Sequence, residues 1–131
     1  MKVKDLSGRI HSWNLTGCTP SRLASRPRSE LHLKTRELMY EEFKNDPILE
    51  EVAIPGEQLF LDFYLPKRKL AVEAQGEQHY KFIRHFHGDI MGFKKQKQND
   101  IRKREWCEIN GIILITLLYS ENIDEWRAKF R

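Results

Sequence analysis

The segment Gln58–Tyr80 reads QLFLDFYLPKRKLAVEAQGEQHY, and it decides the fold that we expect for this chain of 131 residues. Apolar side chains recur at every second position on both sides of residues 66–69, which favours two β-strands over a helix. The four residues PKRK between the two runs are suited to a tight turn. The segment therefore predicts a β-hairpin.

A hairpin that is symmetric about the bond between Lys67 and Arg68 has a defined register. One of its faces is wholly apolar, through the opposed pairs Leu61–Ala74, Phe63–Val72 and Leu65–Leu70. On the other face Asp62 lies beside Glu73, and two carboxylates in such positions repel each other unless a cation lies between them. Mg²⁺ is bound by carboxylate oxygens. The pair therefore predicts a divalent metal site, the alternative being two solvated acids on a polar face of the sheet.

The composition is that of one globular domain with a core of its own. Hydrophobic residues make up 40% of the chain and charged residues 32%, and this length is sufficient to bury a core. The sequence has no apolar run long enough to cross a membrane and no secretory signal at its start, so we expect a cytoplasmic protein without a membrane partner. Cys18 and Cys107 belong to no CxxC pair, which favours reduced thiols over a zinc site or a disulfide.

The net charge of +4 is modest, but the basic residues are concentrated in two places. One is the N-terminal stretch 1–28, and the other runs from Lys94 to Arg104. Such patches are typical of nucleic-acid-binding proteins, although a basic helix face is as often simply solvated. The residues that we expect to contact phosphates are Arg22, Arg26, Arg28, Lys94, Lys95, Lys97 and Arg102.

The first half of the chain predicts an arm, a helix and a strand. Residues 1–28 are expected to form a basic N-terminal arm with little core of its own and at most a short hairpin around Ile10–Leu15. A single domain then covers residues 29–131. Its first helix begins with Ser29 as N-cap and runs to about Lys44, because an Asn-Asp-Pro sequence ends it. A strand near residues 48–54 leads into the hairpin.

The second half predicts a long helix, a strand and a last helix. Residues 81–89 suit a loop or a short helical turn, and a helix over 92–110 ends at an Asn-Gly pair. The apolar run IILITLLY (112–119) suits a strand buried on both faces. Ser120 can cap a last helix with one apolar side that completes the core, the alternative being a contact in a larger assembly; this side holds Ile123, Trp126 and Phe130. The order α-β-β-β-α-β-α predicts an α/β fold with a mixed sheet (α+β).

Polar side chains suited to catalysis follow the third strand. His79 comes shortly after Glu73 and is expected to act as a general base or to hold a water near the metal. Asp100 lies seven residues from both Phe93 and Cys107 on one helical stripe, so it needs a cation or a donor as partner. We expect Asp100 to take part in the site, the alternative being salt bridges one turn away to Lys97, Lys103 or Arg104.

Two other features leave their alternatives open. His85 and His87 form an HxH pair, which is either a pair of ligands or, as is more common on a basic loop, exposed to solvent. Glu30 lies in the first turn of the first expected helix, where the helix dipole already explains an acid.

Four segments in order resemble the PD-(D/E)XK nuclease superfamily, and within it the branch around very-short-patch-repair (Vsr) endonucleases and EDxHD homing endonucleases. They are RSELHL (28–33), LFLDFYLP (59–66), LAVEAQGEQHY (70–80) and QNDIRKREWCEINGIILITL (98–117). The resemblance covers most of residues 28–118. It implies a restriction-endonuclease-like core and Mg²⁺-dependent hydrolysis of DNA phosphodiesters, with Mn²⁺ able to substitute, in an intracellular protein of bacterial or phage type.

The resemblance also implies roles for single residues. Asp62 and Glu73 match the metal-binding acids, with the carbonyl of Ala74 completing the metal shell. His79 matches the histidine after the third strand. The two remaining matches are Glu30, as the first-helix glutamate, and Asp100, as the helix aspartate.

Gln75 stands where the superfamily usually has lysine. In a working nuclease Gln75 would orient the attacking water, with help from His79. The alternative is a non-catalytic nucleic-acid-binding module on a degenerate nuclease fold. Strong sequence specificity in so small a domain would require the arm, a partner or a homodimer.

Overall fold

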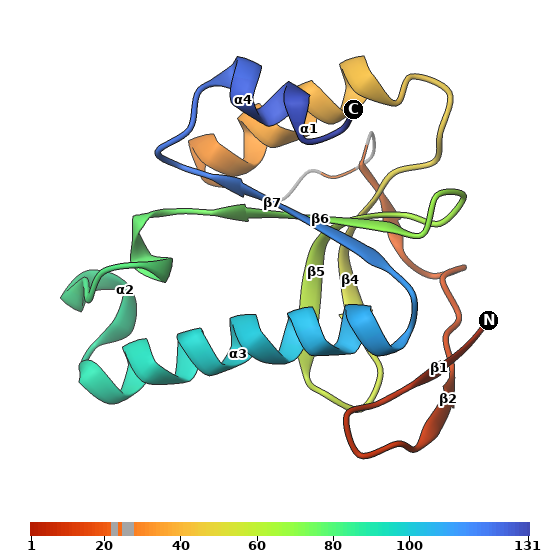
Figure 1. The fold of residues 1–131 in the computed structure, drawn as a ribbon, viewed down its shortest axis with the longest axis horizontal. Helices are drawn as coiled ribbons and strands as arrows, with labels where there is room; N and C mark the ends of the chain where they lie inside the picture. The colour runs from red at the N-terminus through yellow and green to blue at the C-terminus, as the bar shows by residue number, and fades with distance from the viewer. Residues whose placement is uncertain (22–23, 25–27) are drawn as a thin grey trace.

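A five-stranded mixed sheet forms the centre of the computed structural model, which describes residues 1–21, 24 and 28–131 (Figure 1). The strand order is β3-β4-β5-β6-β7; β6 and β7 run parallel, and the other neighbours are antiparallel. The strands are β3 (Thr19–Pro20), β4 (Leu49–Ile54), β5 (Leu59–Leu65), β6 (Leu70–Gln75) and β7 (Ile113–Leu118). This confirms the expected α/β class with a mixed sheet.

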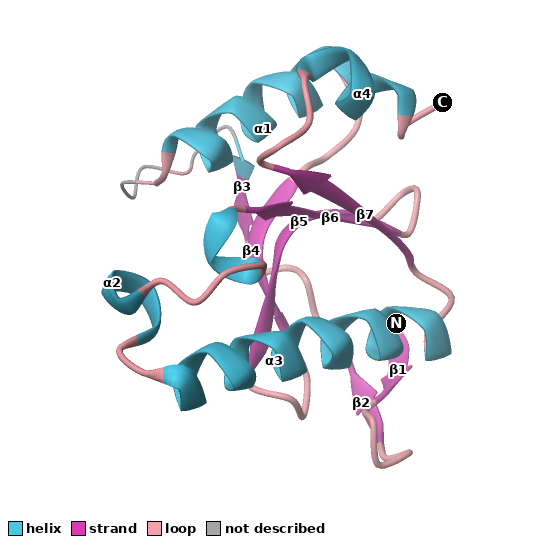
Figure 2. Ribbon diagram, turned by 60° about the vertical axis from the view of Figure 1, so that its left-hand side comes forward, coloured by secondary structure: helices cyan, strands magenta, loops and turns pink. Residues whose placement is uncertain are grey.

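Helices cover both faces of the sheet (Figure 2). One face carries α1 (Glu30–Glu42) and α4 (Ile123–Ala128), and the other carries α3 (Ile90–Ile109). Short helical turns, η2 (Glu77–His79) and α2 (Arg84–His87), join β6 to α3. The expected order of the main elements is therefore confirmed.

Local signals place the two long helices where the sequence indicated. The Ser29 side chain caps α1 by accepting a hydrogen bond from the backbone N–H of His32. The α3 helix starts two residues earlier than expected, because Asp89 caps it by accepting from Gly92 N. It ends before Gly111, whose φ of +66° lies in the left-handed region that glycine adopts freely.

The predicted register of the hairpin is confirmed near the turn. The backbone pairs Phe63 with Val72, and the register continues as Tyr64–Ala71 and Leu65–Leu70. The turn at residues 66–69 sets this register, because it leaves only one way for the two strands to meet.

The prediction that Leu61 shares an apolar face with Phe63 and Leu65 is wrong. Phe63 and Leu65 pack in a core cluster with residues of α1 and α4, whereas Leu61 packs in a second cluster with Trp106 of α3. Glu51, with a φ of +50°, interrupts the β4–β5 ladder between the backbone pairs Glu50–Phe63 and Val52–Leu61. Figure 2 shows both strands running from the sheet toward α3.

Two expectations for the C-terminal third are also corrected. The strand β7 is not buried on both faces along its length, since it forms the edge of the sheet and Ile113 is 62% exposed. The cap of α4 is Asn122 rather than Ser120, and its side chain accepts from Glu125 N at 2.8 Å. The expected apolar side of α4 does complete the core, through Trp126, Ile123 and Phe130.

The N-terminal residues are part of the fold rather than an arm with little core. A two-stranded ribbon joins β1 (Lys2–Lys4) to β2 (Ile10–Ser12), and β3 adds an edge strand to the main sheet. Val3 and Trp13 are buried in the cluster on the α3 side. The indole N–H of Trp13 donates to the carbonyl of Ala53 at 3.0 Å, which ties the ribbon to β4.

In the part of the chain that the structure describes, no helix has the length and the apolar character required to span a bilayer.

Candidate functional site

A pocket between the β4–β5 strand pair, η2 and α3 brings together most of the side chains suited to catalysis. Its lining includes Asp62, His79, Gln96, Asp100 and Lys103. Glu73 lies just beneath it, paired with Lys103 and only 5% exposed. The β5–β6 hairpin supplies the two acids, and one face of α3 supplies the residues opposite them.

The side chains of Asp62 and Glu73 accept hydrogen bonds from backbone N–H groups at the point where the backbone pairing of β5 with β6 ends. Asp62 Oδ2 accepts from the backbone N–H of Ala74 at 2.9 Å, and Glu73 Oε2 lies 3.3 Å from the N–H of Asp62. Each carboxylate therefore takes an N–H from the other strand, beyond the last backbone pair at Phe63–Val72. This fixes the two acids side by side, as the register predicted.

The environment of Glu73 disfavours its charged form. Burial and then the negative charge of Asp62 hold the pKa of Glu73 well above its usual value. Lys103 acts in the opposite direction, with Nζ 2.9 Å from Glu73 Oε1. Burial disfavours the ammonium of Lys103, but the charge and hydrogen bond of Glu73, together with the charges of Asp62 and Asp100, outweigh burial and raise the pKa of Lys103.

Lys103 is a site residue that the sequence reading missed, because it was considered only as a salt-bridge partner for Asp100. A signal for it was present, since Gln96, Asp100, Lys103 and Cys107 recur at spacings of four, three and four along one face of α3. Cys107 is buried on this face, where burial raises its pKa to about 12. The stripe therefore faces the sheet, and Lys103 reaches Glu73 from it.

The donor set fits a hard cation such as Mg²⁺. Mg²⁺ is commonly bound by one or two carboxylates together with water and substrate phosphates. Asp62 and Glu73 are two such groups, and Glu73 Oε1 has the Lys103 ammonium 2.9 Å away but accepts no other hydrogen bond from the residues that the structure describes. Over residues 1–21, 24 and 28–131, no group of three or more His, Cys, Asp or Glu residues could form a fuller protein cage.

The structure places Asp100 beside His79. His79 Nδ1 lies 2.8 Å from Asp100 Oδ2, and both side chains are mostly buried. Gln96 lies on the other side of the imidazole, with its Nε2 3.2 Å from His79 Nε2. Asp100 therefore orients the histidine, and the salt bridges to neighbouring lysines that the sequence left open are not its principal contact.

His87 is part of the same network, while its neighbour His85 is exposed. His87 Nε2 lies 2.9 Å from Gln96 Oε1, and His85 stacks edge-on against the exposed ring of Phe86. The HxH pair therefore divides into one network residue and one surface residue.

Two predicted site residues do not line this pocket. Glu30 is exposed on α1 and lines a separate hollow with Leu33, Arg36 and Tyr40. The side chain of Gln75 accepts a hydrogen bond from the hydroxyl of Tyr80. The structure thus gives Gln75 a partner other than the carboxylate pair.

The basic residues divide into exposed and engaged groups. Lys94, Lys95 and Lys97 are exposed on α3, and Lys97 Nζ lies over the Phe93 ring at 5.1 Å. Two of the expected phosphate contacts are held by acids instead: Arg102 Nη2 lies 3.3 Å from Glu57 Oε1, and Arg28 forms an ion pair with Glu51. Arg22 and Arg26 lie outside the described residues.

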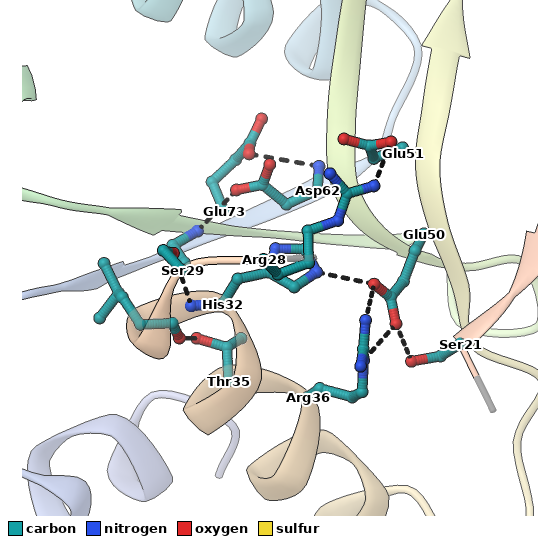
Figure 3. A network of polar contacts seen from close by, with 12 residues as sticks. Ser21, Arg28, Ser29, His32, Thr35, Arg36, Glu50, Glu51, Asp62 and Glu73 are labelled. Carbon is teal, nitrogen blue, oxygen red and sulfur yellow. Dashed lines mark hydrogen bonds and ion pairs between the residues drawn. The ribbon is translucent and has the colours of Figure 1, made fainter. Parts of the chain in front are cut away.

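A second buried carboxylate, Glu50, holds the adjoining part of the sheet (Figure 3). His32 Nε2 lies 2.6 Å from Glu50 Oε1, Arg36 binds both carboxylate oxygens at 2.7 and 2.9 Å, and the hydroxyl of Ser21 also donates to it. Burial disfavours the charge of Glu50, but these donors together lower its pKa to about 2. The network joins α1 to β4, one residue from Glu51 at the pocket.

Comparisons with known proteins find relatives in viruses. The chain is 47% identical over 62 residues to uncharacterized protein 307L of Invertebrate iridescent virus 6, covering 47% of this chain and 32% of that protein. It is 41% identical over 66 residues to uncharacterized protein 094L of Frog virus 3 (isolate Goorha), covering 50% and 43%. It is 35% identical over 72 residues to uncharacterized protein 033L of Invertebrate iridescent virus 3, covering 55% and 37%.

The matches thus take in about half of this chain and less than half of each relative. No protein-family model matches the chain. No solved structure matches it either.

Proposed function

We propose that this chain is a Mg²⁺-dependent endonuclease that hydrolyses DNA phosphodiester bonds on a restriction-endonuclease-like core. One observation carries the proposal: a pair of adjacent carboxylates, a partly buried lysine and an aspartate-supported histidine meet at one pocket. A purely structural role does not explain this grouping, because two carboxylates side by side on neighbouring strands destabilise a sheet. Electrostatic cost of this kind is common at catalytic sites.

The residues of the pocket can divide the work of hydrolysis between them. Asp62 and Glu73 would hold Mg²⁺, with the carbonyl of Ala74 as a third oxygen donor; the ion would polarise the scissile phosphate. His79 accepts a proton from the attacking water through Nε2. The water oxygen bonds to phosphorus, the bond from phosphorus to the leaving oxygen breaks, and solvent returns a proton to that oxygen.

Lys103 supplies the positive charge that Gln75 cannot. Its ammonium contacts Glu73 Oε1 and lines the pocket, so it is placed to stabilise negative charge that develops on the phosphate oxygens. Lys94, Lys95 and Lys97 extend this positive surface along α3 and are suited to binding the DNA backbone without reading its sequence. Strong sequence specificity would then come from a second copy of the chain or from another partner.

Cleavage assays test the proposal directly. A panel of labelled DNA substrates should include duplex, nicked, branched and single-stranded forms, with an RNA strand as comparison, and each should be incubated with Mg²⁺, Mn²⁺ or EDTA. We expect metal-dependent cleavage that Asp62→Asn and His79→Ala reduce by about 10²-fold or more. Asp124→Asn is the control, because that carboxylate is exposed on α4. Equal cleavage by the Asp62→Asn and Asp124→Asn proteins would reject the site.

The ion pair between Lys103 and Glu73 favours one other function, a nucleic-acid-binding module without catalysis. In that case the lysine permanently takes the place of a metal beside Glu73. Calorimetric titration separates the two functions. A nuclease should bind Mg²⁺ or Mn²⁺ in a manner that Glu73→Gln abolishes, whereas a simple binding module should bind DNA equally well with and without EDTA and leave it intact.

A further inference from the structure

Two backbone groups determine which ring nitrogen of His87 carries a proton. Its Nδ1 lies 2.9 Å from the backbone N–H of Ile83, and its Nε2 lies 2.8 Å from the carbonyl oxygen of Gln78. A backbone N–H can only donate and a carbonyl can only accept. His87 therefore has a lone pair on Nδ1 and a proton on Nε2.

The proton on His87 Nε2 determines the orientation of the Gln96 amide, and that orientation in turn determines the tautomer of His79. Since His87 Nε2 is a donor, Gln96 presents its carbonyl Oε1 to it at 2.9 Å and its amide group to His79 Nε2 at 3.2 Å. His79 Nε2 must then accept, so the proton of the neutral ring lies on Nδ1. Asp100 Oδ2 accepts that proton at 2.8 Å.

We propose that His87 and Gln96 are positioning residues that hold His79 as the Nδ1–H tautomer, with its Nε2 lone pair available to the pocket. Asp100 favours a proton on Nδ1, which it accepts, and the amide N–H of Gln96 favours a lone pair on Nε2. Gln96 cannot turn over, because His87 Nε2–H would then face its amide group.

The chain of hydrogen bonds from His87 through Gln96 to His79 also explains how Nε2 of His79 becomes available for catalysis. The contact between Gln96 and His79 is the longest in the chain of hydrogen bonds, and both side chains line the pocket. A water molecule or a substrate hydroxyl can therefore replace the amide at Nε2 while Asp100 keeps the ring in place. This role rests on the proposed nuclease function, but the assignment of the protons does not.

Nuclear magnetic resonance of protein labelled with ¹⁵N-histidine tests the assignment, because the shifts of the two ring nitrogens report which one carries the proton. We expect His79 to show a protonated Nδ1 and an unprotonated Nε2. Gln96→Glu replaces a donor by an acceptor, so His79 Nε2 should become protonated. Gln98→Glu is the matched control, as it makes the same change at an exposed position on the same helix.

Further variants guard against a change in folding. Gln96→Met removes the donor without adding charge and should give a mixed population of the two His79 tautomers. His87→Ala should do the same, while His85→Ala, on the exposed histidine, should leave the His79 signals unchanged. A protonated Nε2 in the wild-type protein, or His79 shifts that are the same in Gln96→Glu and Gln98→Glu, would overturn the inference.

Kinetics distinguish failure of the inference from failure of the function. If the protein is a nuclease, Gln96→Glu should lower kcat about 10²-fold with little change in KM, which is the size expected for loss of a general base. If the tautomer responds but the wild-type protein cleaves no substrate, the proposed function fails and the proton assignment stands. If the wild-type protein cleaves and Gln96→Glu alters neither kcat nor the His79 shifts, the positioning role is rejected and the nuclease function stands.

Discussion

Lys103 Nζ on α3 lies 2.9 Å from Glu73 Oε1 on β6, so a helical cation partly neutralises one of two carboxylates that meet where the β5–β6 hairpin separates. The two residues are 30 positions apart along the chain. Their contact joins the helix layer to the sheet directly beneath the pocket. It also makes the stability of the fold depend on the charge of the site.

The Glu73 carboxyl should make the protein less stable as the pH rises. Its pKa in the folded state is well above the usual value of 4.5, through burial and then the charge of Asp62. The stability linked to its proton is complete below about pH 4.5 and is lost as the pH rises through the folded pKa. Urea unfolding at a series of pH values should show this loss in the wild-type protein and a smaller one in Glu73→Gln. Glu105→Gln, on an exposed position of α3, should match the wild-type slope.

The Lys103–Glu73 contact should show strong coupling in a double-mutant cycle. Lys103→Met leaves a buried carboxylate without its cation, which costs roughly 3–5 kcal/mol at neutral pH. The double variant Lys103→Met/Glu73→Gln removes both charges and should recover most of that loss. Urea unfolding of the four proteins measures the coupling, and Lys95→Met controls for loss of an exposed lysine. Additive effects of the two substitutions would contradict the contact.

Glu50 should have the opposite pH dependence to Glu73. Its pKa falls to about 2 because the hydrogen bonds from His32, Arg36 and Ser21 outweigh burial. A lowered pKa gives stability that is present above about pH 4.5 and is lost as the pH falls toward 2. Glu50→Gln should therefore lower the free energy of unfolding by roughly 3–5 kcal/mol at pH 7, and the deficit should shrink in acid. Glu37→Gln, exposed on α1, is the control, and circular dichroism during urea unfolding is the measurement.

The exposed lysines of α3 should determine how DNA binding depends on salt. If Lys94, Lys95 and Lys97 each contact one phosphate, changing each to Gln should reduce the slope of log K against log salt by about 0.9. Fluorescence anisotropy with duplex DNA at several salt concentrations measures this slope, with EDTA present to prevent cleavage. Arg102→Gln should change the slope less, because Arg102 is held by Glu57. An equal effect at Arg102 would mean that its contact with Glu57 opens when DNA binds.

Sequence patterns were sufficient for the parts of this fold that depend on neighbouring residues. The Pro66–Lys69 turn determines the register of β5 and β6, and Ser29 determines the start of α1. These features follow from backbone geometry and capping within a few residues. The same local reasoning placed Asp62 beside Glu73, and in the structure the Glu73 carboxylate accepts from the N–H of Asp62 while the Asp62 carboxylate accepts from the N–H of Ala74.

Sequence patterns were insufficient to predict which segments far apart in the chain pack against each other. Trp13 lies in the stretch that was expected to form an arm with little core, yet it packs against Tyr64 and Trp106 in the core. The run at 113–118 reads as a central strand and forms an edge, because β6 is its only neighbour in the sheet that the structure describes. An apolar run has the same composition in either position, so only the packing of the other strands decides between them.

The sequence by itself determined that this protein is a mixed α/β domain with two acids side by side on a hairpin, because period-two alternation and a tight turn act over short distances. Only the tertiary structure decided what surrounds those acids. The α3 helix brings Lys103 to Glu73 and Gln96 to His79, and its Trp106 packs in one core cluster with Leu61. These contacts join residues that are far apart along the chain, and the packing of helices on the sheet is what brings them together.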